Sequence, residues 1–138
     1  MQLQDFFNAA GGGLADSVKI VFFKMLPRPA QIDKVRAEIN RTLLKKYGRM
    51  TRLEIDRIQR TITVELDLKG EKASVQIRLT NYRLHEAAGQ PPRFEPGTIT
   101  ASREWLDALL QTLAANGAIP DRLEIKNPLH QAVVKSLL

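Results

Sequence analysis

The sequence predicts an α+β fold in which a long twisted antiparallel β-hairpin, or a small antiparallel sheet, is packed with about four helices. Three observations lead to this expectation. Apolar residues recur at helical spacing near both ends of the chain, and apolar and polar residues alternate between about residues 51 and 84. The segment Lys69–Lys72, with Gly70 inside it, divides the alternating stretch as a tight turn does. The 138 residues are expected to form one domain, 1–138.

The first helix is predicted by an apolar stripe that repeats every three or four residues through residues 1–26. Gly11–Gly13 interrupt this stripe, and three glycines destabilise a helix by roughly 3 kcal/mol relative to alanine. We therefore expect a helix from about Leu14 to Leu26, preceded by a semi-detached helical segment over residues 1–13. The stripe consists of Leu3, Phe7, Ala10, Leu14, Val18, Val21 and Met25, and it can pack in the core or on a second copy of the chain. At this helical spacing, Phe7 and Phe22 are expected to be core residues.

A second helix is predicted to begin near Pro29, since proline suits the first turn of a helix. It is expected to end at Tyr47, with Gly48 as a left-handed C-cap. A charged stripe on this helix contains Lys34, Arg41 and Lys45. The stripe expected to be buried contains Ile32, Val35, Ile39, Leu43 and Tyr47.

The alternating stretch predicts strands on both sides of the turn at Gly70–Glu71, with Ile62 opposite Leu79. The alternation breaks phase twice, at Ile58 and again before Tyr82. Two breaks at nearly the same level of the ladder are typical of one long, strongly twisted hairpin. A break in each strand, which gives four short strands, explains the same pattern.

The last third of the chain predicts a loop, two short strands and two helices. Residues 86–97 contain three prolines and two glycines, and we expect a mobile loop there. A strand at residues 98–101 precedes a helix capped by Ser102, whose inward stripe is Trp105, Leu109 and Leu113. A strand around residues 123–125 precedes a final helix, which is capped by Asn127 and has Leu129, Val133 and Leu137 inward.

The formal net charge of +6 is concentrated in one part of the chain. Residues 27–60 carry ten lysines and arginines against four acids, whereas residues 1–26, 61–100 and 101–138 are each charge-balanced. A localised excess favours an anionic partner such as a membrane surface or nucleic acid. A solvated helix face followed by a charged edge strand explains it equally well.

Several kinds of chemistry are excluded or unsupported. The chain has no cysteine, which excludes disulfides and cysteine nucleophiles. His85 and His130 stand apart from carboxylates at metal-ligand spacing, and no nucleophile motif is present. We therefore expect a non-enzymatic protein with no catalytic residue, metal or cofactor. The start resembles neither a signal peptide nor a membrane-spanning helix, and the expected location is cytoplasmic or peripheral to a membrane.

The phenylalanine-rich start beside the basic segment predicts binding to lipid, to an apolar ligand or to an anionic membrane surface. Two alternatives remain: a nucleic-acid interface on the same basic segment, and a homodimer formed through the N-terminal helix. Nucleic acid is the weaker of these, because Tyr47 is the one aromatic among the ten basic residues. The candidate contact residues for lipid are Phe6, Phe22, Phe23, Lys34, Arg41, Lys45, Lys46, Arg49 and Arg52.

Overall fold

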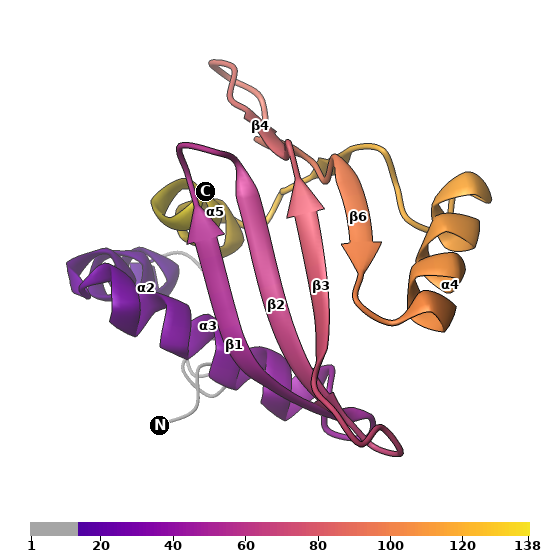
Figure 1. The fold of residues 1–138 in the computed structure, drawn as a ribbon. Helices are drawn as coiled ribbons and strands as arrows, with labels where there is room; N and C mark the ends of the chain where they lie inside the picture. Colours follow the sequence, from indigo (N-terminus) through magenta and orange to yellow (C-terminus); the bar gives the residue numbers. More distant parts are fainter. Residues whose placement is uncertain (1–13) are drawn as a thin grey trace.

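The structure, a computed structural model, describes residues 14–138, with side chains from residue 18 onward. It confirms the α+β class: these residues form four helices, a four-stranded antiparallel sheet and a second sheet of three short strands (Figure 1). The helices are α2 (Leu14–Met25), α3 (Arg28–Thr42), α4 (Glu104–Ala115) and α5 (Pro128–Leu137). The segment predicted over residues 1–13 lies outside the described residues.

The main sheet has the strand order β1-β2-β3-β6, and the second sheet has the order β4-β5-β7. Of the two arrangements that the sequence leaves open, the small sheet is the one formed. The break at Ile58 is the turn between β1 and β2, and the break before Tyr82 separates β3 from β4. Ile62 pairs with Leu79 as predicted. The strands are β1 (Gly48–Asp56), β2 (Thr61–Leu68), β3 (Val75–Thr80), β4 (Arg83–His85), β5 (Arg93–Glu95), β6 (Thr98–Ala101) and β7 (Leu123–Glu124).

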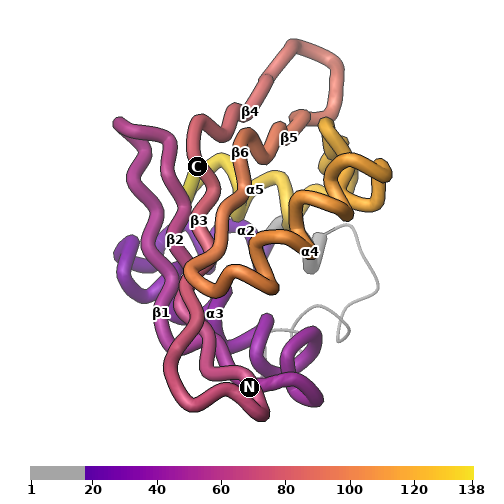
Figure 2. The backbone as a smooth tube through the Cα atoms, turned by 45° about the vertical axis from the view of Figure 1, so that its right-hand side comes forward, coloured from indigo at the N-terminus to yellow at the C-terminus, as the bar shows by residue number. Residues whose placement is uncertain are grey.

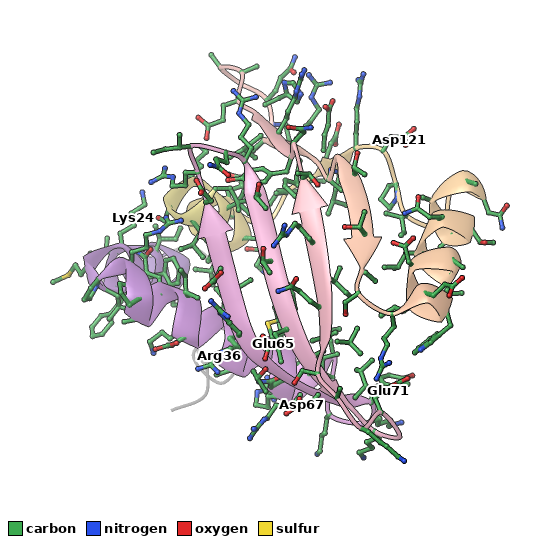
Figure 3. The ribbon with its side chains drawn as sticks, viewed as in Figure 1. Lys24, Arg36, Glu65, Asp67, Glu71 and Asp121 are labelled. Carbon is green, nitrogen blue, oxygen red and sulfur yellow. The ribbon has the colours of Figure 1, made fainter. Side chains whose placement is uncertain are left out.

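The alternation of the sequence divides the main sheet into an apolar and a polar face. Met50, Leu66 and Val75 are partners in one cross-strand row, and all three are buried. The opposite face carries polar side chains such as Glu65 and Asp67 along β2 (Figure 3). Because side chains alternate between the faces of a strand, the two-residue period directs the apolar set into the core.

Helices flank both edges of the main sheet. α3 runs along β1 at one edge, and α4 packs against β6 at the other. Figure 2 shows α4 beside β6. α2 packs against α5, the C-terminal helix. The two ends of the described chain therefore meet in one helical pair.

Side chains of α3 supply hydrogen bonds to the free edge of β1. The Asn40 amide donates to the Met50 carbonyl oxygen at 3.0 Å and accepts from the Met50 N–H at 2.6 Å. The Arg36 guanidinium, which lies between α3 and β1 in Figure 3, donates to the Thr51 carbonyl oxygen at 3.1 Å. An edge strand presents unpaired backbone groups that otherwise invite pairing with another chain. Here the helix satisfies them.

Arg28, at the start of α3, extends this connection to the C-terminal helix. Its guanidinium donates to the carbonyl oxygens of Ile55 on β1 at 3.2 Å and of Leu137 at 3.0 Å. A further bond of 3.3 Å reaches the Ser136 carbonyl oxygen. One side chain therefore joins α3, β1 and α5.

The end of α3 differs from the prediction. The helix stops at Thr42, so Leu43 and Tyr47 are exposed rather than part of its buried stripe. Gly48 is the first residue of β1 and not a helix cap. A Cβ atom at Gly48 would lie 2.1 Å from the Asp67 carbonyl oxygen, so glycine is required there by the close approach of β1 and β2.

Two predictions for α4 are also wrong. The Ser102 hydroxyl accepts from the Gln76 N–H at 2.9 Å, so it joins β6 to β3 and does not cap the helix. Trp105 and Leu109 are exposed, and Leu106 is the buried residue of α4. The helix packs through the face adjacent to the expected one.

The last segments follow the sequence more closely. The Asn127 side chain accepts from the Leu129 and His130 N–H groups, which confirms it as the cap of α5. Leu129 and Leu137 are buried as expected. Within the expected loop 86–97, however, residues 93–95 form β5, the central strand of the second sheet. The three prolines of this segment predict a loop, because proline has no N–H to donate to a strand ladder. They lie outside residues 93–95, so they do not prevent β5 from pairing.

We expect Asn40→Ala to lower the free energy of unfolding by about 2 kcal/mol, because it leaves the buried Met50 backbone groups without partners. Urea denaturation followed by circular dichroism measures this change. Lys34→Ala, an exposed position on the same helix, is the matched control and should change the value by less than about 0.5 kcal/mol. Equal losses in the two variants would contradict the assigned role of Asn40.

Candidate functional site

The outward face of α2 is apolar. Val18, Val21, Phe22 and Met25 are 53%, 56%, 62% and 76% exposed, and their spacing of three and four residues places them on one side of the helix. This set is named the α2 stripe below. The sequence predicts that Phe22 lies in the core, whereas the structure places it on the surface beside Val18, Val21 and Met25 of the predicted stripe.

The reason is that α2 has two apolar faces. Phe23 is only 4% exposed, and Lys19 is buried on the same side, where α2 packs against α5. Periodicity identifies an apolar stripe but does not say which of two apolar faces meets a partner. Of the two candidates for lipid contact on α2, Phe22 therefore lies on the surface and Phe23 lies in the core.

The corner between α2 and α3 fixes the direction of the α2 stripe. The buried amide of Gln31 on α3 donates to the Phe23 carbonyl oxygen at 3.0 Å. The Leu26 N–H donates to the same oxygen at 3.1 Å. These bonds satisfy a carbonyl at the end of α2, where the helix lacks its own donors. They hold α2 at a set angle to α3.

One cation accompanies the α2 stripe on the same helix. Lys24 is exposed in the last turn of α2 (Figure 3). At 100° per residue, it lies roughly a third of a turn from the middle of the stripe. A lysine at the border of an apolar face can extend its ammonium group toward water or phosphate while its methylenes stay on the apolar side.

The basic segment 27–60 does not form one surface. Arg28 and Arg36 are occupied by backbone oxygens, as described above. Arg41 pairs with Glu38, and Arg52 pairs with Glu54. Four of the predicted contact residues are exposed cations without a hydrogen bond or ion pair to another described residue: Lys34, Lys45, Lys46 and Arg49.

Three of these four cations gather at the turn between α3 and β1. Lys45, Lys46 and Arg49 are all exposed there, together with Leu43 and Tyr47. Lys34 lies on α3 itself. Phe6, the remaining candidate, lies outside the described residues. The predicted site is thus divided between α2, α3, the following turn and β1, which contains Arg49 and Arg52.

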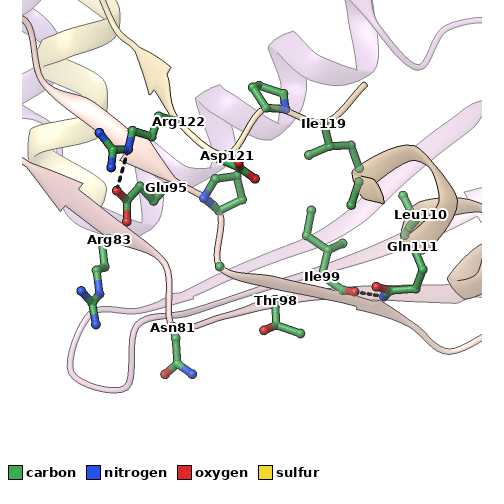
Figure 4. Close-up of a pocket in the computed structure, with 14 residues that line it drawn as sticks. Asn81, Arg83, Glu95, Thr98, Ile99, Leu110, Gln111, Ile119, Asp121 and Arg122 are labelled. Atoms are coloured by element: carbon green, nitrogen blue, oxygen red, sulfur yellow. Dashed lines mark hydrogen bonds and ion pairs between the residues drawn. The ribbon is translucent and has the colours of Figure 1, made fainter. Parts of the chain in front are cut away.

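A polar cavity of about 530 Å³ lies elsewhere, between the second sheet, β6 and α4 (Figure 4). Arg122 pairs with Glu95 at 3.4 Å on one wall, and the Gln111 amide donates to the Ile99 carbonyl oxygen at 2.6 Å on another. Sequence reasoning missed this cavity because its walls come from four distant segments, none of which carries a motif. Its charges are balanced, since Arg83 and Arg122 face Glu95 and Asp121.

Glu95 also contacts a histidine. The His85 Nε2 atom lies 3.1 Å from a Glu95 carboxylate oxygen, across the pairing of β4 with β5. The hydrogen bond from His85 is the main cause that holds the pKa of Glu95 below its usual value, and it outweighs desolvation. The ionised carboxylate therefore stabilises the fold above the unfolded-state pKa. That contribution is lost as pH falls through the lower folded-state pKa.

The residues that the structure describes also bear on two further classes of site, a metal centre and a membrane-spanning helix. These residues contain no group of three or more histidines and acids that could hold a metal ion. None of their helices is both long enough and apolar enough to span a lipid bilayer. Comparison of the chain with protein family models, curated proteins and solved structures finds no match.

We expect His85→Leu to raise the titration midpoint of Glu95, because the hydrogen bond that favours the carboxylate is removed. Carboxyl-carbon NMR across acidic pH reports this midpoint directly. His130→Leu removes a histidine on α5 and serves as the control, which should leave Glu95 unchanged. An identical Glu95 midpoint in the native protein and in His85→Leu would show that the contact is without effect.

Proposed function

We propose that this protein binds anionic membrane surfaces through the α2 stripe, with exposed lysines and arginines of α2, α3 and the following turn adding attraction. The observation that carries the proposal is the exposure of Val18, Val21, Phe22 and Met25 on one helix face. Scattered apolar residues on a protein surface are ordinary, but a contiguous set of this kind is typical of an interaction site. The expected cytoplasmic, membrane-peripheral location stays part of this proposal.

The size of the α2 stripe suits an interfacial helix. Twelve residues of helix are about 18 Å long, and such a helix lies in the plane of the headgroups with its apolar face a few ångströms deep. Full burial of a Val, Met or Phe side chain contributes about 1.5–3 kcal/mol. Four side chains that are already partly buried therefore contribute on the order of 4 kcal/mol. This is too little for stable attachment without a second source of affinity.

Charge supplies that second source. A lysine or arginine close to an anionic leaflet contributes about 1 kcal/mol, and this contribution falls with salt. Lys24 lies on the same helix as the stripe, and Lys34 and Lys45 are the exposed members of the predicted charged stripe. Arg41 is the third member of that stripe, but its pairing with Glu38 gives it a contact within the protein. Tests of charge therefore use the lysines.

We expect Phe22→Gln to weaken association with anionic vesicles about tenfold, because the largest side chain of the α2 stripe is lost. Flotation with vesicles of phosphatidylglycerol and phosphatidylcholine measures this, and pure phosphatidylcholine vesicles should retain little protein. Leu109→Gln on α4 is the matched control, since Leu109 is also an exposed apolar residue, at 45%. Charge reversal at Lys34 and Lys45 should weaken flotation further.

The same experiment separates a membrane from a second copy of the chain. A homodimer that buries the α2 stripe predicts a Phe22→Gln variant that turns monomeric, and native mass spectrometry reports that state. No flotation of the native protein at low salt would remove the membrane proposal. Equal flotation of Phe22→Gln and Leu109→Gln would remove the α2 stripe as the contact.

Nucleic acid is the second candidate ligand, and one observation favours it. Tyr47 is 66% exposed between Lys46 and Arg49, and an aromatic ring among cations is a platform for single-stranded bases. On this alternative, Tyr47→Ala should weaken binding of a single-stranded oligonucleotide about tenfold, with a steep dependence on salt. Electrophoretic retardation measures it. Failure of the native protein to retard DNA or RNA at low salt would exclude this alternative.

A further inference from the structure

Three arginines line a cleft of about 360 Å³ at the end of the main sheet opposite the turn between β2 and β3. Arg57 and Arg60 come from the turn between β1 and β2, and Arg83 opens β4. Tyr82, Leu84, His85 and Leu138 complete the lining. The lining contains no aspartate or glutamate side chain. The cleft is distinct from the α2 stripe, since the two share no residue.

The backbone around the cleft is held in place. The Asp56 carboxylate accepts from the N–H groups of Ile58 and Gln59 at 3.0 Å each, so it is directed into the turn. The Arg60 carbonyl oxygen accepts from the Tyr82 N–H at 3.3 Å, which ties the turn to the start of β4. Arg60 itself has a φ of 56°, an uncommon left-handed conformation for a residue other than glycine. Such a conformation persists where the surroundings determine it.

The three guanidinium groups are available to a ligand. In the part of the chain that the structure describes, none of them has a hydrogen bond or an ion pair within the protein. Of the neighbouring carboxylates, Asp56 accepts hydrogen bonds within the turn, and Glu95, the cross-strand partner of Arg83, contacts His85 and Arg122.

Tyr82 adds a neutral polar group beside the arginines. Its ring is buried, and its hydroxyl donates to the Leu138 carbonyl oxygen at 3.3 Å. Burial raises the pKa of Tyr82, although Arg57, Arg28 and Arg60 oppose this effect. The hydroxyl therefore stays protonated at neutral pH and does not compete with an anion for the arginines.

We propose that Arg57, Arg60 and Arg83 bind a phosphate group. Guanidinium groups match phosphate oxygens with paired hydrogen bonds, and a doubly charged phosphomonoester offers enough acceptors for all three. The phosphate can belong to a lipid headgroup or to a soluble molecule. Ile58 is 94% exposed at the tip of the same turn, where an apolar side chain between arginines can enter the surface of a bilayer.

Isothermal titration of the native protein with inorganic phosphate tests the site itself. We expect saturable binding of one phosphate, weakened at least tenfold in Arg83→Gln and in Arg60→Asn, where asparagine tolerates the left-handed backbone. Arg78→Gln on β3 is the matched control, because it removes an exposed arginine outside the cleft and should bind phosphate as the native protein does. Circular dichroism confirms that each variant is folded.

Vesicles distinguish the two sources of phosphate. If the ligand is a lipid headgroup, the protein prefers phosphatidic acid to phosphatidylserine at equal charge, and Arg83→Gln and Ile58→Gln lose this preference. If the protein binds phosphate without this preference, the ligand is a soluble phosphate. Absence of saturable phosphate binding, or equal affinity in Arg83→Gln and Arg78→Gln, would overturn the proposal. Phe22→Gln should bind phosphate as the native protein does. A failure of the α2 stripe as a membrane contact can therefore be distinguished from a failure of the phosphate site.

Discussion

The hydrogen bonds between α3 and the free edge of β1 are the contacts on which the rest of the arrangement depends. Asn40 and Arg36 satisfy backbone groups that an edge strand leaves open. Arg28 joins the same strand to α5, and Gln31 holds the end of α2. One helix therefore positions the edge of the sheet and both terminal helices of the described chain. Polar side chains of α3 make these connections, and they hold the helix beside the edge of the sheet.

This use of α3 changes the meaning of the basic segment. Arg28 and Arg36 hydrogen-bond backbone oxygens within the protein. The number of basic residues in 27–60 is therefore larger than the number of cations that can contact a ligand. What remains exposed are lysines on α3 and in the turn that follows it, Arg49 at the start of β1, and an arginine cleft at the β1–β2 turn. The apolar contribution to binding is assigned to α2. A membrane contact on this account combines a short helix with dispersed charges, and neither is sufficient alone.

The fold was more predictable from the sequence than the candidate site. The alternation of apolar and polar residues predicts the pairing of Ile62 with Leu79, and Asn127-Pro128 predicts the start of α5. Both features are set by residues close together in the sequence. The direction of α2 depends on α5, a partner distant in sequence, and both faces of α2 are apolar. Ser102 has the chemistry of a cap but bonds Gln76 instead. The arginine cleft forms where the β1–β2 turn meets the start of β4 through the hydrogen bond from the Tyr82 N–H to the Arg60 carbonyl oxygen, and no sequence motif predicts this contact.

A single fluorescent label on α2 shows whether the α2 stripe contacts lipid. The chain has no cysteine, so Val21→Cys carries an environment-sensitive dye at one position of the stripe, and Leu109→Cys carries it on α4. If the α2 stripe contacts lipid, anionic vesicles shift the emission of the Val21 label to the blue and leave the emission of the Leu109 label unchanged. A vesicle-bound protein whose Val21 label does not shift, or shifts no more than the Leu109 label, would contradict this contact.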